Sequence, residues 1–377
     1  MSLYIGLTGY MGSGKGELIK MLAKSGYAPL SLSDMVRAEA TKRKLAHTRG
    51  NLQDVGNDLR SKHGPGVLGK MICETIERET ARPFAVKARN GPAHRSSERN
   101  EERSGPAHRS SEQGEERRWV IDGIRNPGEA DELRKLSGFR LIGITAPTDT
   151  IITRLQKRKR EGAALTKKQI VERLEREKGV GEPPEGQQVK KCLDRVDYLI
   201  INDGTLKDLE AKLRHFLRLL SGEDRPSFHE VFMEIAYAWA KRATCLRRKV
   251  GSVIAKDKQQ LTAGYNGAPR GIPHCAEMGG CLREKLKIPS GQRHEICRGT
   301  HAEQNAITQA AKFGINIEGG TLYCNCFPCV ICTKMILNAG ITTVVYDSDY
   351  DDALSKEILG QQKLLKLVRY EGWKYGA

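Results

Sequence analysis

Two short stretches of the chain carry metal-binding residue types at a spacing typical of a catalytic site. His301 is followed two positions later by Glu303, and Pro328 directly precedes a C-x-x-C pattern formed by Cys329 and Cys332. One imidazole and two thiolates leave the fourth position of a tetrahedral zinc ion open, which separates a catalytic zinc from a structural one. We therefore expect His301, Cys329 and Cys332 to hold a catalytic Zn²⁺.

Glu303 is the expected proton carrier of this site. Zinc lowers the pKa of a bound water towards neutrality and so supplies a nucleophile at the pH of the cell. Glu303 is too near His301 in the sequence to be an easy fourth ligand, and it is well placed to carry a proton from the water to a leaving ammonia. This H-x-E and P-C-x-x-C pattern is the signature of zinc deaminases of cytosine and adenine. The alternative is a structural knuckle beside an unrelated histidine, but apolar residues at helical spacing follow both stretches and favour the deaminase interpretation.

The elements that must position these residues follow a polar, proline-ended linker at 221–226. The apolar spacing of 228–242 predicts a helix, and 250–254 and 261–265 resemble a hairpin followed by a glycine turn at 264–269. An asparagine in such a turn presents both a donor and an acceptor to a sugar or base. We predict that Asn266 and Ala302 contact the substrate, although Asn266 could instead serve only the turn.

Several motifs in this half agree in order and spacing with one family. They are Thr244-Cys245 through Val250-Gly251, then G-Y-N-G-A-P-R-G, Pro273-His274-Cys275, H-A-E-Q-N-A-I and P-C-x-x-C. Over residues 228–350 the chain resembles the deoxycytidylate (dCMP) deaminases. The resemblance implies a central five-stranded sheet between helices, zinc-dependent conversion of dCMP to dUMP, a homo-oligomer, and control by dCTP and dTTP. Where members commonly have Tyr-Val-Thr, this chain has Tyr323-Cys324-Asn325, which affects the base pocket rather than the zinc ligands.

A second group of soft ligands precedes the catalytic motif. Cys275 and Cys281, together with His294 and Cys297, lie at metal-ligand spacing in a long loop with little apolar content. Four such ligands make a closed structural zinc site that would order this loop, with Cys245 as a possible substitute ligand. Buried free cysteines are the alternative.

The N-terminal half begins with a buried strand, a glycine loop and a helix through Lys24. This is the context of a phosphate-binding loop, in which backbone N–H groups and a lysine face the phosphates. The residues expected to bind nucleotide are Gly9, Gly12, Ser13, Gly14, Lys15 and Gly16. The loop resembles that of adenylate-kinase-like nucleoside monophosphate kinases, which also have Gly after the lysine. Those kinases normally have Thr next, where this chain has Glu17, so nucleotide binding is better supported than kinase activity.

Further apolar runs predict the sheet that carries this loop. The strand 119–122 ends in Asp122, which suits coordination of Mg²⁺, and 141–144 and 198–201 add two more strands. We expect an α/β fold: a P-loop parallel sheet with flanking helices, followed by a cytidine-deaminase-like three-layer α/β/α domain. The expected ligand is ATP or a deoxynucleoside triphosphate with Mg²⁺.

The two expected domains are 1–222 and 227–377, with an insertion at 90–118 in the first. Within this insertion, 90–103 and 104–117 are two copies of one polar 14-residue unit, which cannot bury a face. We interpret it as a disordered insertion, too short for a solenoid.

The composition of the chain indicates the cellular compartment of the protein and the classes of molecule that it binds. Most of the ten cysteines stand among histidines at metal-ligand spacing, which favours a reduced, cytoplasmic, zinc-binding protein over a secreted one. Neither a signal peptide nor an apolar run long enough to cross a membrane is present. The net charge is +17, of which residues 223–377 contribute only +5. A basic chain attracts nucleotides and nucleic acids alike.

These observations lead to one main hypothesis and one rival. The main hypothesis is hydrolytic deamination of a deoxycytidine nucleotide, dCMP or dCTP, with a nucleoside triphosphate at the P-loop as regulator or second activity. The two-domain order also resembles bacterial antiphage deaminases. The rival is a deaminase acting on RNA or single-stranded DNA, but such enzymes usually add aromatic platforms, and aromatic residues are only 6% of this chain.

Overall fold

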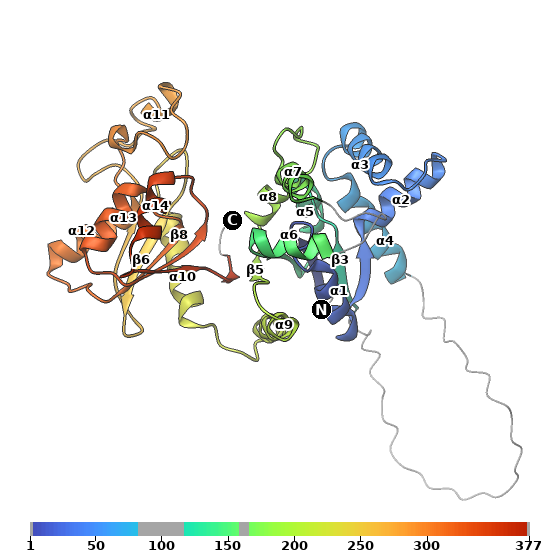
Figure 1. Cartoon of the computed structure of the whole chain (residues 1–377), viewed down its shortest axis with the longest axis horizontal. Helices are drawn as coiled ribbons and strands as arrows, with labels where there is room; N and C mark the ends of the chain where they lie inside the picture. The colour runs from blue at the N-terminus through green and yellow to red at the C-terminus, as the bar shows by residue number, and fades with distance from the viewer. Residues whose placement is uncertain (1–2, 82–116, 158–165, 375–377) are drawn as a thin grey trace, which may run out of the picture.

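The chain folds around two separate β-sheets, each flanked by helices, which lie side by side in Figure 1. The computed structural model describes residues 3–81, 117–157 and 166–374. The predicted α/β class and the order of the two folds along the chain are confirmed. The repeated unit at 90–117 lies outside the described residues, except for Arg117.

The N-terminal sheet has six strands in the order β11-β5-β4-β1-β3-β2. Their bounds are β1 (Leu3–Thr8), β2 (Ala28–Ser31), β3 (Arg118–Asp122), β4 (Phe139–Thr145), β5 (Tyr198–Ile201) and β11 (Gly372–Trp373). The first five pair in parallel, and their apolar runs are buried on both faces, as parallel strands between helices must be. Only β11 runs antiparallel, on the edge of β5.

Nine helices surround this sheet in the described part of the chain. They are α1 (Lys15–Lys24), α2 (Leu32–Lys42), α3 (Arg49–His63), α4 (Val67–Ala81), α5 (Pro127–Leu133), α6 (Thr148–Lys157), α7 (Lys167–Lys178), α8 (Val189–Leu193) and α9 (Leu206–Ser221). The loop between β1 and α1 is the predicted phosphate-binding loop. Gly9, Gly12 and Gly14 have φ values of +151°, +74° and +115°, a backbone that favours glycine.

The C-terminal sheet has five strands in the order β10-β9-β8-β6-β7, as the family resemblance implies. Their bounds are β6 (Gly251–Lys256), β7 (Gln259–Tyr265), β8 (Thr321–Cys326), β9 (Thr343–Ser348) and β10 (Lys366–Arg369). The predicted hairpin is β6 and β7, which pair antiparallel. Strands β8, β9 and β10 are parallel to one another.

Helices cover both faces of this sheet, which gives the expected three layers. They are α10 (Phe228–Ala240), α11 (Leu282–Lys285), α12 (Ala302–Phe313), α13 (Val330–Asn338) and α14 (Ala353–Gln361), with a 3₁₀ turn at His294–Ile296. Because side chains alternate along a strand, Tyr323 of β8 packs towards α10, whereas its neighbours Leu322 and Cys324 pack with α12 and α13. The two helices that begin at the predicted zinc ligands therefore share one face of the sheet.

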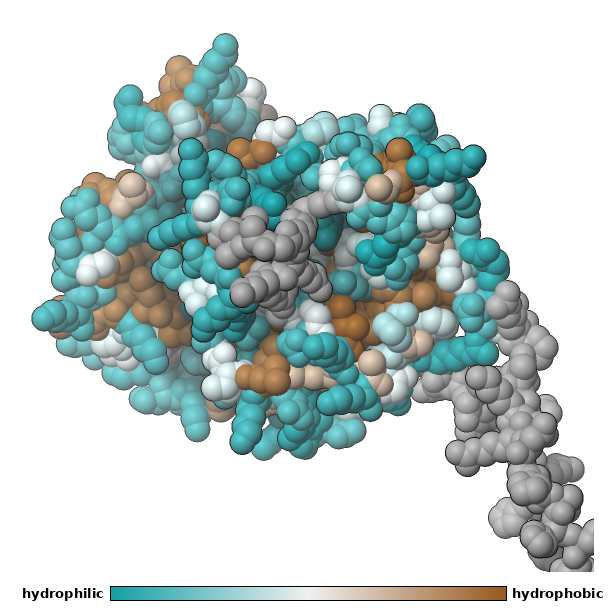
Figure 2. Space-filling view, turned by 45° about the vertical axis from the view of Figure 1, so that its right-hand side comes forward, coloured by the Kyte–Doolittle hydropathy of each residue, from teal (hydrophilic) through white to brown (hydrophobic). Residues whose placement is uncertain are grey.

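The face in Figure 2 is largely hydrophilic, with separate hydrophobic patches. Within the described ranges, no helix is both long and apolar enough to cross a lipid bilayer. The sequence did not predict β11, which places residues at the end of the second expected domain in the sheet of the first.

Candidate active site

The predicted zinc ligands meet at the N-termini of two helices. His301 is the N-cap residue of α12, and Cys329 is the N-cap residue of α13 with Cys332 in its first turn. The Nδ1 atom of His301 lies 3.3 Å from Sγ of Cys329 and 3.4 Å from Sγ of Cys332. Among the described residues, these three form the one group of potential metal ligands within 4.8 Å of one another.

The donor set fits zinc. One imidazole nitrogen and two sulfurs are ligands that Zn²⁺ accepts, and three protein ligands leave one position for water or substrate. Helix N-termini favour negative charge, so both helices favour the thiolate forms that a metal requires. A hydrogen bond from the Cys332 thiol is the main reason why the pKa of Cys329 falls to about 4.

Glu303 lies in the first turn of α12, directly beside this group. Its side chain is buried, with 4% of the residue exposed, and burial raises its pKa to about 7 although nearby His301 opposes the rise. A carboxyl group with such a pKa can both accept and release a proton near neutral pH. Ala302, between His301 and Glu303, is fully buried and lines the same cavity.

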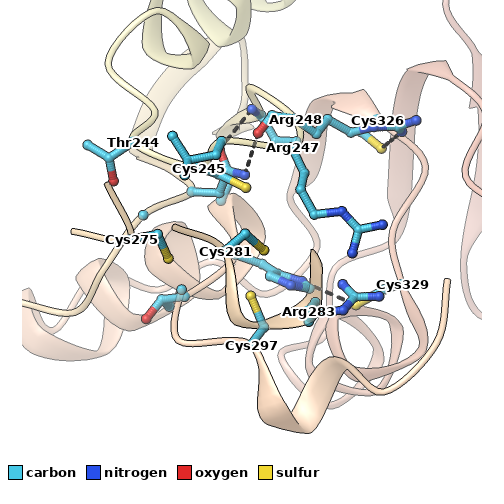
Figure 3. Close-up of a pocket in the computed structure, with 18 of the residues that line it drawn as sticks. Thr244, Cys245, Arg247, Arg248, Cys275, Cys281, Arg283, Cys297, Cys326 and Cys329 are labelled. Atoms are coloured by element: carbon cyan, nitrogen blue, oxygen red, sulfur yellow. Dashed lines mark hydrogen bonds between the residues drawn. The ribbon is translucent and has the colours of Figure 1, made fainter. Parts of the chain in front are cut away.

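A cavity of about 220 Å³ opens beside His301 and Glu303. Its lining includes Arg247, Arg248 and Arg283, whereas Glu303 is its one carboxylate among the described residues. Figure 3 shows the Arg247 side chain extending into the cavity, and one of its guanidinium nitrogens is buried without a hydrogen-bond partner in the described structure. Such a cation suits an anionic group of a ligand.

Asn266 also lines the cavity, but both ends of its amide bind the protein backbone. Its Oδ1 accepts a hydrogen bond from the Val250 backbone N–H at 2.8 Å, and its Nδ2 donates to the Arg248 carbonyl at 2.8 Å. In this structure the side chain therefore fixes the segment that carries the two arginines. A substrate contact by this amide remains a prediction.

The glycine loop borders a second, larger cavity of about 970 Å³. Gly12, Gly14, Lys15, Gly16 and Asp122 line it, whereas Gly9 and Ser13 do not, and nucleotide binding by these residues stays a prediction. The Lys15 ammonium donates to the carbonyls of Gly9 and, at 3.0 Å, of Tyr10.

Two orphaned oxygens beside this cavity fit a nucleotide with its metal ion. One carboxylate oxygen of Asp122 and the hydroxyl of buried Ser13 lack hydrogen-bond partners in the described part of the chain. A carboxylate oxygen and a hydroxyl are ligand types that Mg²⁺ and phosphate groups accept.

Comparison with known proteins decides the family. Residues 226–348 match the profile described as the cytidine and deoxycytidylate deaminase zinc-binding region, and residues 5–177 match the profile described as an AAA domain. A deoxycytidylate deaminase of Schizosaccharomyces pombe is 33% identical over 236 residues, which are 62% of this chain and 71% of that protein. The chain belongs to the deoxycytidylate deaminase family.

Two further similarities each cover part of this deaminase. A UPF0200 protein of Sulfurisphaera tokodaii is 26% identical over 216 residues, which are 57% of this chain and 95% of that protein. The crystal structure of a dCMP deaminase from the cyanophage S-TIM5 in complex with dCMP and dUMP is 28% identical, covers 39% of this chain and 99% of its own, and has a TM-score of 0.32. The family resemblance seen in the sequence is confirmed.

The second cysteine group of the deaminase faces the same cavity as the first. Cys245, Cys275, Cys281 and Cys297 all line it, as Figure 3 shows. Burial raises the pKa of Cys275, and the nearby thiols of Cys281, Cys297 and Cys245 raise it further. His294 is oriented differently, because its Nε2 lies 3.0 Å from the Tyr350 hydroxyl. Cys245 thus lines the cavity with the other three cysteines, but in the described structure no three of these four thiols lie within 4.8 Å of one another.

The sequence did not identify the cationic lining of the deaminase cavity. Arg247 and Arg248 precede β6, and Arg283 lies in α11, where its guanidinium group donates to the carbonyls of Pro289 and Gln292. Arg248 donates to Sγ of Cys326 at 2.8 Å, and its guanidinium lies 5.2 Å from the centre of the Tyr350 ring. The adjacent arginines at 247 and 248 are visible in the sequence. Whether their side chains face the cavity depends on the fold, which the sequence pattern does not show.

Proposed function

We propose that this deaminase hydrolyses the amino group of dCMP, giving dUMP and ammonia. The observation that carries the proposal is the convergence of His301, Cys329 and Cys332 on one point, with the buried carboxyl of Glu303 beside it. The matching zinc-binding region and the relative from S. pombe support both the metal and the substrate class.

The four residues have two separate roles in the proposed reaction, zinc binding and proton transfer. His301, Cys329 and Cys332 would hold Zn²⁺, which supplies a Lewis acid and lowers the pKa of water. Glu303 takes a proton from the attacking water as the oxygen bonds to C4 of the base. It passes this proton to N3 of the ring, then takes the second proton from the oxygen on C4 and passes it to the departing amino group, so that the C4 carbonyl forms, the C–N bond breaks and ammonia leaves.

The arginine lining supports a phosphorylated substrate. Arg247 offers a buried nitrogen without a partner in the described structure, and Arg283 lies on the same cavity. A phosphate group would complete hydrogen bonds that the protein leaves open. We infer that dCMP is preferred to deoxycytidine, and dCTP is a second substrate to test.

The N-terminal half is proposed to bind ATP or a deoxynucleoside triphosphate with Mg²⁺. Gly9, Gly12, Ser13, Gly14, Lys15 and Gly16 would surround the phosphates, and Asp122 would contact the metal ion. We infer that this nucleotide regulates deamination or supports a second activity. Depletion of deoxycytidine nucleotides would suit an antiphage role, which the resemblance to bacterial antiphage deaminases suggests.

Two further proposals concern metal and assembly. We infer a structural zinc among Cys275, Cys281 and Cys297, with Cys245 as the fourth ligand in place of the predicted His294. We also propose a homo-oligomer, as the family resemblance implies. Light scattering on the purified protein would measure its size.

The proposed function is tested by ammonia release from dCMP, dCTP, CMP, deoxycytidine and single-stranded DNA. The unmodified protein should favour dCMP, and Glu303→Gln should keep its zinc but lose about 10²- to 10⁴-fold in rate, since one carboxylate serves several proton transfers. Glu318→Gln, an exposed carboxylate outside the cavity, is the matched control. Preferred turnover of single-stranded DNA would replace the proposal with the nucleic-acid rival.

A further inference from the structure

The segment Tyr370–Lys374 connects the two sheets of the molecule directly. Strand β10 ends at Arg369 in the deaminase sheet, and after two residues β11 pairs with β5 of the P-loop sheet. The register places Gly372 opposite Leu199 and Trp373 opposite Tyr198. Two residues thus separate β10, an edge strand of the deaminase sheet, from β11, an edge strand of the P-loop sheet.

On the P-loop side, this segment is held by charged and aromatic contacts. Glu371 accepts a hydrogen bond from the Ile201 backbone N–H at 3.0 Å and pairs with Lys212 at 2.9 Å. Lys212 also donates to the Ile201 carbonyl at 2.6 Å. The Trp373 ring lies 5.4 Å from that of Tyr198 and 5.6 Å from that of Phe216.

On the deaminase side, a buried ion pair fixes the same segment. The Lys374 ammonium lies 2.8 Å from a carboxylate oxygen of Asp347, and both side chains are less than 7% exposed. Asp347 belongs to β9, and the next residue, Ser348, accepts a hydrogen bond from the Phe327 backbone N–H at 2.8 Å. Phe327 stands two positions before Cys329. A shift of Lys374 would therefore reach the turn that carries a predicted zinc ligand.

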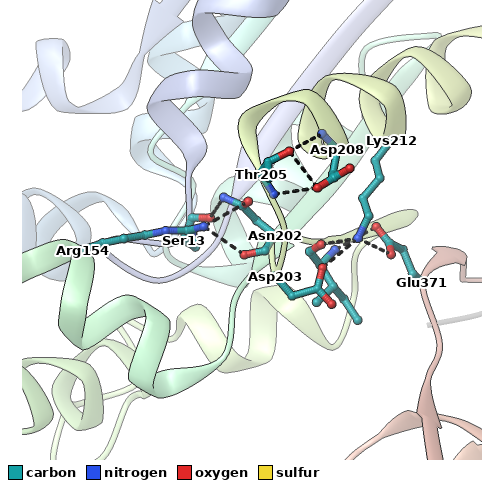
Figure 4. Close-up of polar contacts among 9 residues, drawn as sticks. Ser13, Arg154, Asn202, Asp203, Thr205, Asp208, Lys212 and Glu371 are labelled. Carbon is teal, nitrogen blue, oxygen red and sulfur yellow. Dashed lines mark hydrogen bonds and ion pairs between the residues drawn. The ribbon is translucent and has the colours of Figure 1, made fainter.

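The other end of this chain of contacts is the phosphate-binding loop, as Figure 4 shows. Asn202 directly follows β5, and its buried amide donates to the Ser13 carbonyl at 2.8 Å. The same amide packs against Gly14, where any side chain would collide with it. Arg154 donates to the Asn202 side chain at 3.3 Å. Asn202 is thus positioned to respond to the conformation of the loop.

Strand β11 has the features of a two-state element. It consists of two residues at the edge of the P-loop sheet, and a small set of contacts made by Glu371, Trp373 and Lys374 decides whether it docks on β5. Phosphate groups entering the loop would compete for the Lys15 ammonium, which now binds the loop carbonyls of Gly9 and Tyr10. The loop, and with it Asn202 and β5, must then adjust.

We propose that docking of Tyr370–Lys374 on β5 is the switch by which a nucleotide at the P-loop changes the rate of deamination. This inference rests on the proposed function, because it assumes that both sites bind nucleotides. Occupancy of the loop shifts the docking equilibrium of β11, and the Lys374–Asp347 pair transmits the change to β9. Coupling of this kind requires an element whose equilibrium both sites bias, and β11 contacts both halves.

The test measures deamination of dCMP by the full chain with and without saturating ATP and Mg²⁺. The ratio of the two kcat/KM values reports the coupling, which is typically 5- to 150-fold between linked sites. Lys212→Met removes the ion pair from the P-loop side, and Glu371→Gln removes it from the other side while keeping an acceptor for Ile201. Lys207→Met, an exposed lysine on the same helix α9, is the matched control.

We expect the ratio to fall towards one in Lys212→Met and Glu371→Gln, with deamination in the absence of ATP retained, and to stay unchanged in Lys207→Met. Hydrogen exchange at Trp373 should change when ATP binds the unmodified protein. If the unmodified protein responds to ATP and both variants respond equally, the switch is wrong but regulation through the P-loop stands. If the unmodified protein deaminates without any response to ATP, regulation and switch fail together.

Discussion

At the scale of single residues, Arg247 is the side chain whose role is most open to test. We expect Arg247→Gln to lower kcat/KM for dCMP by about 10-fold or more, because a hydrogen bond to a charged group contributes roughly 1.5–3 kcal/mol. Turnover of deoxycytidine, which lacks the phosphate, should change little. Arg242→Gln, an exposed arginine in the same segment, is the control. An equal loss for both substrates would mean that Arg247 acts on structure rather than on the phosphate.

The zinc content of the protein tests whether Cys281 is a ligand of a structural zinc. We expect elemental analysis to give about two zinc ions per chain, one in the open tetrahedral site at His301 and one in the proposed closed site at Cys281. Cys281→Ser should lower this to about one and reduce stability more than it alters chemistry at His301. Cys73→Ser, in the P-loop half, should leave two. One zinc in the unmodified protein would refute the structural site.

The candidate metal ligands were easier to predict than the candidate substrate-binding residues. His301 lies in one short motif, and Cys329 and Cys332 lie in another. Each motif stands at the start of a helix, and the two helix starts bring these three residues together. Arg283 comes from the loop 270–300 and Arg247 from the segment before β6, and whether their side chains reach the cavity depends on how these segments fold. The orientation of His294 was not predictable for the same reason, because its imidazole contacts the hydroxyl of Tyr350, which is distant in the sequence.

At the scale of elements, Asp352 joins two helix starts. Its side chain accepts a hydrogen bond from the Ser355 N–H at 3.0 Å as the cap of α14, and from the Val330 N–H at 2.9 Å at the start of α13. We expect Asp352→Ala to lower the free energy of unfolding by about 0.5–2 kcal/mol, because α14 loses its cap. The Val330 N–H also loses its acceptor, which lowers the free energy of unfolding further. Urea unfolding would measure the loss.

Zinc affinity separates this role of Asp352 from a general one. Because Cys329 is the N-cap residue of α13, a displaced helix start should weaken zinc binding in competition with a chelator. Thr205→Ala removes the cap of α9, far from the cysteines, and should lower stability by a similar amount with zinc affinity unchanged. Equal zinc affinity in both variants would contradict the positioning role of Asp352.

The elements that the sequence predicted well are those with strong local patterns. The apolar runs at 3–7, 119–122, 141–144 and 198–201 all became parallel strands, with ends within two residues. Strand β2 has only four residues and contains Pro29, and β11 consists of Gly372 and Trp373 between charged neighbours. Neither carries a periodic signal, and both owe their conformation to the strand beside them.

At the scale of the whole molecule, nucleotide binding should stabilise the fold. A ligand at 100 times its dissociation constant adds about 2.7 kcal/mol to the free energy of unfolding. We therefore expect ATP with Mg²⁺ to raise the Tm, and Lys15→Ala to abolish the increase. Lys24→Ala, an exposed lysine at the end of α1 that does not line the cavity, is the control. An increase that survives in Lys15→Ala would place the nucleotide elsewhere.

The pairing of β11 with β5 also has a consequence for biosynthesis. Glu371 follows Ile201 by 170 residues, so the ribosome finishes β5 long before the segment that pairs with it. Until then, the edge of the nascent P-loop sheet exposes unpaired N–H and C=O groups that other strands can bind. The first half to be translated is therefore completed by the last described strand, and a chain interrupted within the deaminase half leaves this edge open to aggregation.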